Sequence, residues 1–149
     1  MKINMRINNS DRSFDIEPSE MLYDTLKKLG FTSVKKSCGN GCCGICTVLL
    51  DGNPIPSCAY LTVKCDEHSI TTIEGVPEEA EKIGVYLTDE GAVQCGFCTP
   101  GFLLTIIAMK KELKDPTEEK IKNYLVGNMC RCSGYQGHLR AIKKYLGVS

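Results

Sequence analysis

The N-terminal part of the chain alternates apolar and polar positions with the period of a β-strand. Every second residue of segment 2–8 is apolar, namely Ile3, Met5 and Ile7, and the residues between them are polar or charged. This pattern indicates a strand with one buried face. The turn-forming sequence NNSD at 8–11, with a second alternation after it, predicts a β-hairpin.

The remainder of the first half predicts one short helix and two further β segments. Apolar residues at helical spacing precede a glycine that can end the helix; they are Leu22, Leu26 and Leu29, followed by Gly30. Segment 47–55 predicts a second hairpin, because Asp51 and Gly52 form a turn dipeptide between apolar runs. The β-branched segment 70–75 predicts a final strand.

After Val76 and Pro77 the apolar residues change from strand spacing to helix spacing. Thr99 and Pro100 predict a helix start, because a capping residue precedes a proline suited to the first turn. The apolar positions expected on this helix are Phe102, Leu103, Ile106, Ile107 and Leu113. A second helix start is predicted at 115–120, where acidic residues favour the positive end of the helix dipole. The apolar residues of the last helix are Leu139, Ile142, Tyr145 and Leu146.

These two patterns predict an α+β protein of two units, residues 1–75 and 76–149. Units this small bury little apolar surface and commonly need a metal or disulfide staple. The 18 basic residues balance 18 acidic ones, so the formal net charge is zero. A neutral chain lacks the positive surface of a nucleic-acid-binding protein, and no nucleic-acid partner is expected.

The apolar segments also argue against a membrane location. The longest apolar run, residues 102–109, is too short to span a bilayer. Residues 1–10 lack the hydrophobic block of a signal peptide, so a cytoplasmic location is expected. In a reducing compartment, the 10 cysteines indicate metal binding or redox chemistry rather than permanent disulfides.

The first group of cysteines has the spacing Cys38-x4-Cys43-x2-Cys46, with Cys58 further along the chain. This is the plant-type spacing of [2Fe–2S] ligands. Glycines between these cysteines permit the tight loop in which three thiolates can converge. Cys42 is an extra thiol. Neighbouring residues of an extended loop point in opposite directions, so Cys42 and Cys43 are not expected to bind the same iron.

The second group consists of two close pairs, Cys95 with Cys98 and Cys130 with Cys132. Each pair precedes a predicted helix, and helix N-termini favour thiolates and anionic clusters. We therefore expect the two pairs to hold one cluster inside a helical bundle. A zinc knuckle or a thioredoxin-like pair is the alternative for Cys95-x2-Cys98. Neither group offers the two C-x2-C knuckles of a zinc ribbon, and the βαβ context of thioredoxin is missing.

Four other residues with possible metal-binding side chains are interpreted as non-ligands. Cys42 and Cys65 are taken as structural or incidental thiols. His68 and His138 are expected at the surface or in capping positions.

Three motifs together resemble the iron–sulfur subunit of molybdenum hydroxylases, the xanthine dehydrogenase and aldehyde oxidoreductase family. They are SCGNGCCGICTV at 37–48, QCGFCTPG at 94–101 and GNMCRCSGYQ at 127–136, and the resemblance covers nearly the whole chain. It implies a plant-ferredoxin-like β-grasp domain followed by a four-helix-bundle domain. Each domain is then expected to hold one [2Fe–2S] cluster.

The resemblance also implies a role for individual residues. The ligands implied for the distal cluster, which faces a flavin or an external acceptor, are Cys38, Cys43, Cys46 and Cys58. The ligands implied for the proximal cluster, nearest the molybdenum cofactor, are Cys95, Cys98, Cys130 and Cys132. Gln94 and Cys132 match residues that contact the molybdopterin of the partner subunit.

Two positions depart from the family pattern. Cys42 stands where the family usually has a polar or charged residue, and Ile45 stands where it usually has alanine. Neither change removes a ligand. Cys42 leaves open an alternative register, Cys38-x3-Cys42, in which Cys43 would not be a ligand.

The function implied is that of an electron-transfer subunit. It would relay electrons from a molybdenum-pterin site to a flavin or an external acceptor, and the chain by itself is not expected to be catalytic. The partners implied are a molybdenum-cofactor large subunit and a flavin-binding medium subunit, in a hetero-oligomer such as a dimer of heterotrimers. The alternatives are a free-standing ferredoxin-like carrier and a zinc-stabilised interaction module.

Overall fold

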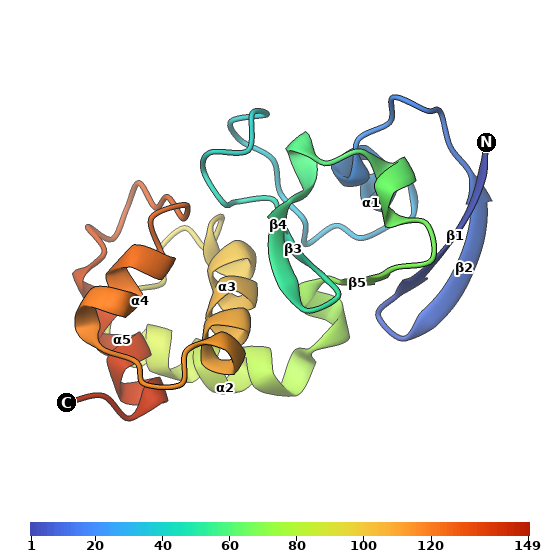
Figure 1. The fold of residues 1–149 in the computed structure, drawn as a ribbon. Helices are drawn as coiled ribbons and strands as arrows, with labels where there is room; N and C mark the ends of the chain where they lie inside the picture. The colour runs from blue at the N-terminus through green and yellow to red at the C-terminus, as the bar shows by residue number, and fades with distance from the viewer.

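The first half of the chain forms a five-stranded mixed sheet in the order β2-β1-β5-β3-β4 (Figure 1). The protein is described by a computed structural model that covers residues 1–149. The strands are β1 (Lys2–Ile7), β2 (Ser10–Asp15), β3 (Thr47–Leu50), β4 (Asn53–Pro56) and β5 (Ser69–Thr71). β1 pairs in parallel with β5, and the other neighbours are antiparallel.

Both predicted hairpins are confirmed, and their turns explain the local sequence. Asn8 and Asn9 connect β1 to β2 with φ angles of 49° and 65°. Asp51 and Gly52 connect β3 to β4 with φ angles of 49° and 85°. Two successive positive φ angles define the turn type that matches strand twist, and asparagine, aspartate and glycine tolerate them best.

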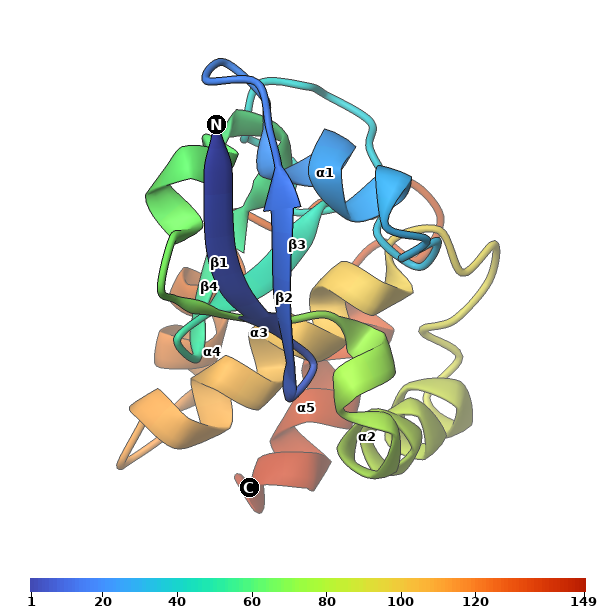
Figure 2. The same cartoon turned by 90° about the vertical axis from the view of Figure 1, so that its right-hand side faces the viewer.

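A short helix, α1 (Leu22–Lys28), covers one face of the sheet (Figure 2). Its residues Leu22 and Leu26 are fully buried, and they pack with Ile3, Ile7 and Ile70 of the sheet in the first hydrophobic core. The predicted helix between Leu22 and Gly30 is therefore confirmed, because its apolar face fits the alternating apolar face of β1.

The strand predicted over 70–75 is wrong beyond Thr71, where β5 ends. The backbone N–H of Thr72 donates to Asn8 Oδ1 at 2.9 Å instead of to a neighbouring strand. A 3₁₀ turn over Ile73–Gly75 then leads into the first long helix. The asparagine of the first hairpin thus ends the strand, a contact between residues far apart in the sequence.

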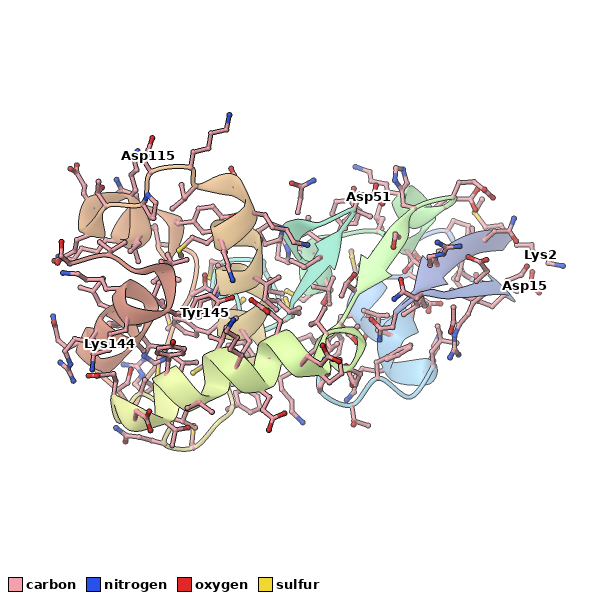
Figure 3. All side chains as sticks on the ribbon, turned by 90° about the horizontal axis from the view of Figure 1, so that it is seen from below. Lys2, Asp15, Asp51, Asp115, Lys144 and Tyr145 are labelled. Carbon is pink, nitrogen blue, oxygen red and sulfur yellow. The ribbon has the colours of Figure 1, made fainter.

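The second half of the chain is helical, which confirms the predicted α+β class. The helices are α2 (Pro77–Asp89), α3 (Thr99–Glu112), α4 (Glu118–Tyr124) and α5 (Gln136–Leu146). Tyr145 of α5 lies beside α2, with its ring centroid 5.8 Å from that of Tyr86 (Figure 3). None of these helices has the combination of length and apolar character that crossing a membrane requires.

Helix α3 joins the two halves of the molecule. Residues 101–109 are buried without interruption, which is expected of a helix that is packed on all sides. α3 contacts β3 and β4 as well as α2, and Figure 1 shows it between the sheet and the other helices. Leu49 of β3 belongs to the same core cluster as the helices. The two halves therefore share a packed interface.

The helix starts predicted near residues 99 and 115–120 are confirmed as α3 and α4, with one correction to the capping residue. The helix predicted to start at 115–120 is α4, and Thr117 caps it, since its side chain accepts a hydrogen bond from the Lys120 N–H at 3.3 Å. Thr99 was expected to cap α3, but it is the first helical residue, and Cys98 occupies the cap position without a side-chain hydrogen bond. A candidate metal ligand, Cys98, therefore lies at the N-terminus of α3.

Candidate metal centres

The first candidate centre is a glycine-rich loop between α1 and β3. Gly39, Gly41 and Gly44 have φ angles of 70°, 80° and 68°, which other residues rarely adopt. These turns fold the loop so that Cys43 and Cys46 are 3% and 1% exposed. The other two members of this group are Cys58, which is 6% exposed, and Cys38, which is partly exposed.

Donor groups around this loop point at sulfur atoms. The backbone N–H of Asn40 and then the Cys43 thiol lower the pKa of Cys38 to about 5. The N–H of Cys58 donates to the Cys46 sulfur at 3.4 Å. Burial and the contact with Cys46 raise the pKa of Cys58 to about 11. The loop therefore supplies N–H donors that stabilise negative charge on bound thiolates.

Cys42 and Cys43 face different surroundings. Cys42 is exposed, and its thiol donates to Asn40 Oδ1 at 2.9 Å. The Cys38 thiol, followed by burial, raises the pKa of Cys42. Cys43 is buried beneath the loop. The two neighbouring thiols therefore differ in burial, while both lie close to the Cys38 thiol.

Two other residues interpreted as non-ligands also lie as expected. Cys65 is fully buried in the first core, and burial raises its pKa to about 12. His68 is an exposed residue, and its Nδ1 lies 2.6 Å from Asp51 Oδ2. Both fit the structural and surface roles predicted for them.

The second candidate centre is formed by two loops that lead into α3 and α5. The sulfur atoms of Cys95 and Cys132 lie 3.6 Å apart, and both residues are exposed. Cys98 and Cys130 are each 8% exposed. Their sulfur atoms lie within 4.8 Å of each other and of a ring nitrogen of His138. The two pairs therefore converge, as the sequence predicts.

The two buried thiols of this centre differ in their pKa values. Burial, and then the Cys130 thiol, raise the pKa of Cys98 to about 12. Burial also raises the pKa of Cys130, but the Ser133 hydroxyl and backbone N–H groups outweigh it, and the net pKa is lowered. Cys130 consequently loses its proton more readily than Cys98 does.

His138 was expected at the surface or in a capping position, and this prediction is wrong. The residue is 2% exposed, and its ring centroid lies 4.3 Å from that of Phe102. Burial lowers its pKa. Ala141 and Ile142, three and four positions further along α5, are core residues, so helical spacing already placed His138 on the inner face.

Gln94 lies at the exposed edge of the second centre. It is exposed itself, next to the exposed ligand candidate Cys95. Large apolar side chains on both loops are also exposed; they are Val93, Phe97, Val126, Met129 and Tyr135. The two loops that carry the cysteines of the second centre therefore also carry these exposed apolar side chains.

The two centres are in direct contact through the backbone. The N–H of Met129, next to Cys130, donates to the carbonyl oxygen of Cys43 at 2.8 Å. A Cβ atom at Gly101 would lie 2.3 Å from the carbonyl oxygen of Gly44. The absence of a side chain at Gly101 thus permits α3 to approach the first cysteine loop.

The residues of both centres fit an iron–sulfur cluster. Each centre gathers four thiols, none of which is in a disulfide. Thiolate ligands favour iron–sulfur clusters or zinc. At the first centre, the plant-type spacing, the turns at glycine and the Cys58 N–H directed at the Cys46 sulfur favour the cluster.

The comparison with protein families agrees with this geometry. Residues 5–68 match the family described as "2Fe-2S iron-sulfur cluster binding domain", and residues 72–143 match the family described as "[2Fe-2S] binding domain". The fold and the two sets of thiols therefore define a protein with two [2Fe–2S]-binding domains.

Similar proteins identify the family. The chain is 43% identical to the nicotinate dehydrogenase small FeS subunit of Eubacterium barkeri, over 89% of this chain and 87% of that protein. It is 41% identical to the xanthine dehydrogenase iron-sulfur-binding subunit of Escherichia coli O157:H7, over 90% and 87% respectively. The crystal structure of quinoline 2-oxidoreductase from Pseudomonas putida 86 matches with a TM-score of 0.90 and 36% identity, over 98% of this chain and 92% of that chain. The chain belongs to the iron–sulfur subunit family of the molybdenum hydroxylases.

Proposed function

We propose that this chain is the electron-transfer subunit of a molybdenum-dependent hydroxylase or dehydrogenase. It relays electrons between a molybdenum-pterin site on a partner subunit and a flavin or an external acceptor. When bound, a [2Fe–2S] cluster supplies one-electron redox capacity at each centre. The observation that carries the proposal is the contact between the two four-cysteine centres, where the Met129 N–H donates to the Cys43 carbonyl oxygen at 2.8 Å.

The proposal assigns four ligands to each cluster. Those of the distal cluster are Cys38, Cys43, Cys46 and Cys58. Those of the proximal cluster are Cys95, Cys98, Cys130 and Cys132. The burial of Cys43 and the exposure of Cys42 support the register that contains Cys43. A buried ligand keeps its cluster away from water, and nearby N–H donors stabilise the negative charge on its sulfur.

Gln94 and Cys132 are proposed to contact the molybdopterin of the partner subunit. Both residues are exposed, so a second chain can reach them. The exposed apolar side chains on the same loops support an obligate interface there. A free-standing ferredoxin-like carrier has no evident use for such a surface, and the match to two [2Fe–2S] families argues against a zinc-stabilised module.

The proposed partners are a large molybdenum-cofactor subunit and a flavin-binding medium subunit, in a dimer of heterotrimers. Relatives named as small or iron–sulfur-binding subunits of dehydrogenases support an assembly of several chains. A cytoplasmic location stays a prediction from the sequence.

The proposed domain boundary lies between residues 75 and 76. It separates a β-grasp domain, residues 1–75, from a four-helix bundle, residues 76–149. The family matches to 5–68 and 72–143 support a boundary in this region. Val76 and Pro77 lead into α2 at this point.

Metal analysis of anaerobically purified protein tests the proposal. We expect about four irons and four acid-labile sulfides per chain, with two distinguishable EPR signals after dithionite reduction. Zinc with little sulfide would contradict an electron-transfer function. Co-expression with the genes of candidate partners should give a complex of fixed stoichiometry, whereas a carrier would purify alone.

A further inference from the structure

The buried side of the second centre holds a further side chain that can bind a metal, that of His138. One of its ring nitrogens and the sulfur atoms of Cys98 and Cys130 all lie within 4.8 Å of one another. The histidine is 2% exposed, and each of the two cysteines is 8% exposed. Two thiolates and an imidazole are ligands that suit zinc and similar divalent ions. A cluster held by four cysteines does not use this histidine.

The imidazole ring is held in position from its other side. Nδ1 of His138 lies 3.0 Å from Ser133 Oγ, and the ring packs against Phe102 with centroids 4.3 Å apart. Because Nδ1 is occupied in this way, Nε2 is the nitrogen that remains to bind a metal. A metal-binding histidine typically donates its other ring N–H to a nearby oxygen atom, which fixes its tautomer and its direction. Ser133 has the place of such a supporting residue.

The exposed pair of cysteines does not belong to this group of mutually close atoms. The sulfur atoms of Cys95 and Cys132 lie 3.6 Å from each other instead. A single zinc ion binds its ligands at about 2.0–2.3 Å and therefore needs donors that are close together. A [2Fe–2S] cluster takes its ligands in two pairs, one on each iron. The three inner donors thus suit a single ion, whereas the four cysteines suit the cluster.

A hollow in the surface gives access to the three inner donors. It has a volume of about 290 Å³, and its lining comes from the end of α4 and the start of α5. Leu125, Asn128, Tyr135 and His138 are among the lining residues. A metal site needs a path by which the ion enters, and this hollow leads to His138 from outside.

We propose that Cys98, Cys130 and His138 bind one divalent ion of the zinc type in a chain that lacks its second cluster. The fourth position of the ion is open to water, as in other zinc sites with three protein ligands. Binding releases the protons of the two thiols. The ion and the cluster exclude each other, because both require Cys98 and Cys130. Metal binding stabilises the folded state that contains the site, so the ion holds α3 and α5 together until a cluster replaces it.

The double variant Cys95→Ala/Cys132→Ala tests this site in the full chain. It removes two ligands of the second cluster and leaves the three inner donors and the first centre in place. After addition of zinc we expect one tightly bound zinc per chain, with the EPR signal of the first cluster retained, so that the ion does not lie at the first centre. X-ray absorption at the zinc edge should show two sulfur neighbours at about 2.3 Å and a histidine nitrogen at about 2.0–2.1 Å.

Substitution of each histidine in this double variant identifies the third ligand. His138→Leu should weaken zinc binding about tenfold or more, since even the loss of a residue that supports a ligand costs about 10–100-fold. It should also abolish the rise in urea midpoint that zinc produces. His68→Leu is the matched control, because His68 is exposed beside Asp51 and should change neither result. Unchanged zinc affinity in His138→Leu, or a folded double variant that binds no zinc, would overturn the proposal.

A measurement on the unsubstituted chain covers the case in which the double variant does not fold. An iron chelator is applied until the second EPR signal has disappeared, and zinc is added once the chelator has been removed. The absorption edge should then show the same two sulfur atoms and one histidine nitrogen. Zinc bound by sulfur alone, or no bound zinc, would contradict the site. A chain that never held two clusters would instead defeat the function proposed above.

Discussion

The two cysteine centres of this protein are built in different ways. At the first centre, one glycine-rich loop brings three cysteines together, and Cys43, Cys46 and Cys58 are buried. At the second, two loops before α3 and α5 each supply two cysteines, and Cys95 and Cys132 remain exposed. A loop-built centre depends on local backbone conformation, whereas a centre between helices depends on how those helices pack.

The difference in exposure suggests a difference in role. A buried cluster is shielded from water and from other molecules, so its neighbours in the chain control its properties. The second centre has exposed ligands beside exposed apolar side chains, which a partner subunit can cover. The first centre is therefore expected to be shielded within this chain, and the second to be covered when a partner subunit assembles with it.

The largest expected effect is a difference in iron content between serine variants of the two neighbouring cysteines of the first centre. Cys43→Ser should remove the first cluster and reduce the iron content to about half, because a plant-type cluster needs four thiolates. Cys42→Ser is the matched control, and it should keep both clusters. Iron and sulfide analysis with EPR measures the outcome. Loss in Cys42→Ser, or equal loss in both variants, would show that the register is wrong.

Treatment with an iron chelator should next reveal which centre is less protected. In the isolated chain the signal of the second cluster should disappear several-fold faster than that of the first, because Cys95 and Cys132 are exposed. Assembly with the partner subunits should remove most of the difference. Timed EPR spectra measure both rates, and faster loss of the first cluster would reverse the comparison.

The contact between the centres is tested by Gly101→Ala. A methyl group there would meet the Gly44 carbonyl oxygen at 2.3 Å, and a backbone atom cannot move away easily. Alanine normally favours a helix by about 0.5–1 kcal/mol over glycine, but overpacking costs about 1–3 kcal/mol. We expect net destabilisation in a denaturant titration, together with weaker magnetic interaction between the two clusters.

Gly84→Ala is the matched control for this variant. Gly84 lies within α2, and no atom is within 4 Å of a Cβ atom built there. Its replacement should leave stability equal or slightly higher, since the helix preference acts alone. If both substitutions had the same effect, the approach of α3 to the first loop would not depend on Gly101.

A smaller effect is expected from the caps of the helical half. Thr117→Ala removes the hydrogen bond that the threonine accepts from the Lys120 N–H, and it should cost about 1 kcal/mol. Thr99→Ala should cost less, because Thr99 is inside α3 and makes no capping bond. Urea unfolding followed by circular dichroism compares the two variants. A larger loss for Thr99→Ala would contradict the assignment of the caps.

The smallest effect concerns the surface ion pairs of Glu118, one with Lys122 within α4 and one with Lys143 of α5. Lys122 and then Lys143 lower the pKa of Glu118 from 4.5 to about 2. A carboxylate with a lowered pKa stabilises the folded state above pH 4.5, and this stabilisation is lost as the pH falls toward about 2. The difference in urea midpoint between the unsubstituted protein and Glu118→Gln should therefore shrink between about pH 6 and about pH 3. Exposed pairs contribute little, so the difference stays small.

The sequence alone predicted the local structure well where the signal lies within a few residues. The positive φ angles at Asn8 and Asn9 and at Asp51 and Gly52 are favoured by those residue types themselves. The two cysteine groups are likewise readable from spacing, and the starts of α3 and α4 were predicted to within a residue or two. The resemblance to the iron–sulfur subunits rests on the three motifs that contain the cysteines. The end of β5 was missed, because Asn8 binds Thr72 across 64 positions of the chain.

The tertiary structure decided what depends on distant residues. The spacing of Cys42 and Cys43 left two registers open, and burial distinguishes the two thiols. His138 was expected at the surface or in a capping position, although the pattern of α5 put it inside. Folding brought it to Ser133 and to Cys98 and Cys130. The reason is physical: turns and helix periods act between near neighbours, whereas burial and the approach of Met129 to Cys43 exist only once the two halves have packed.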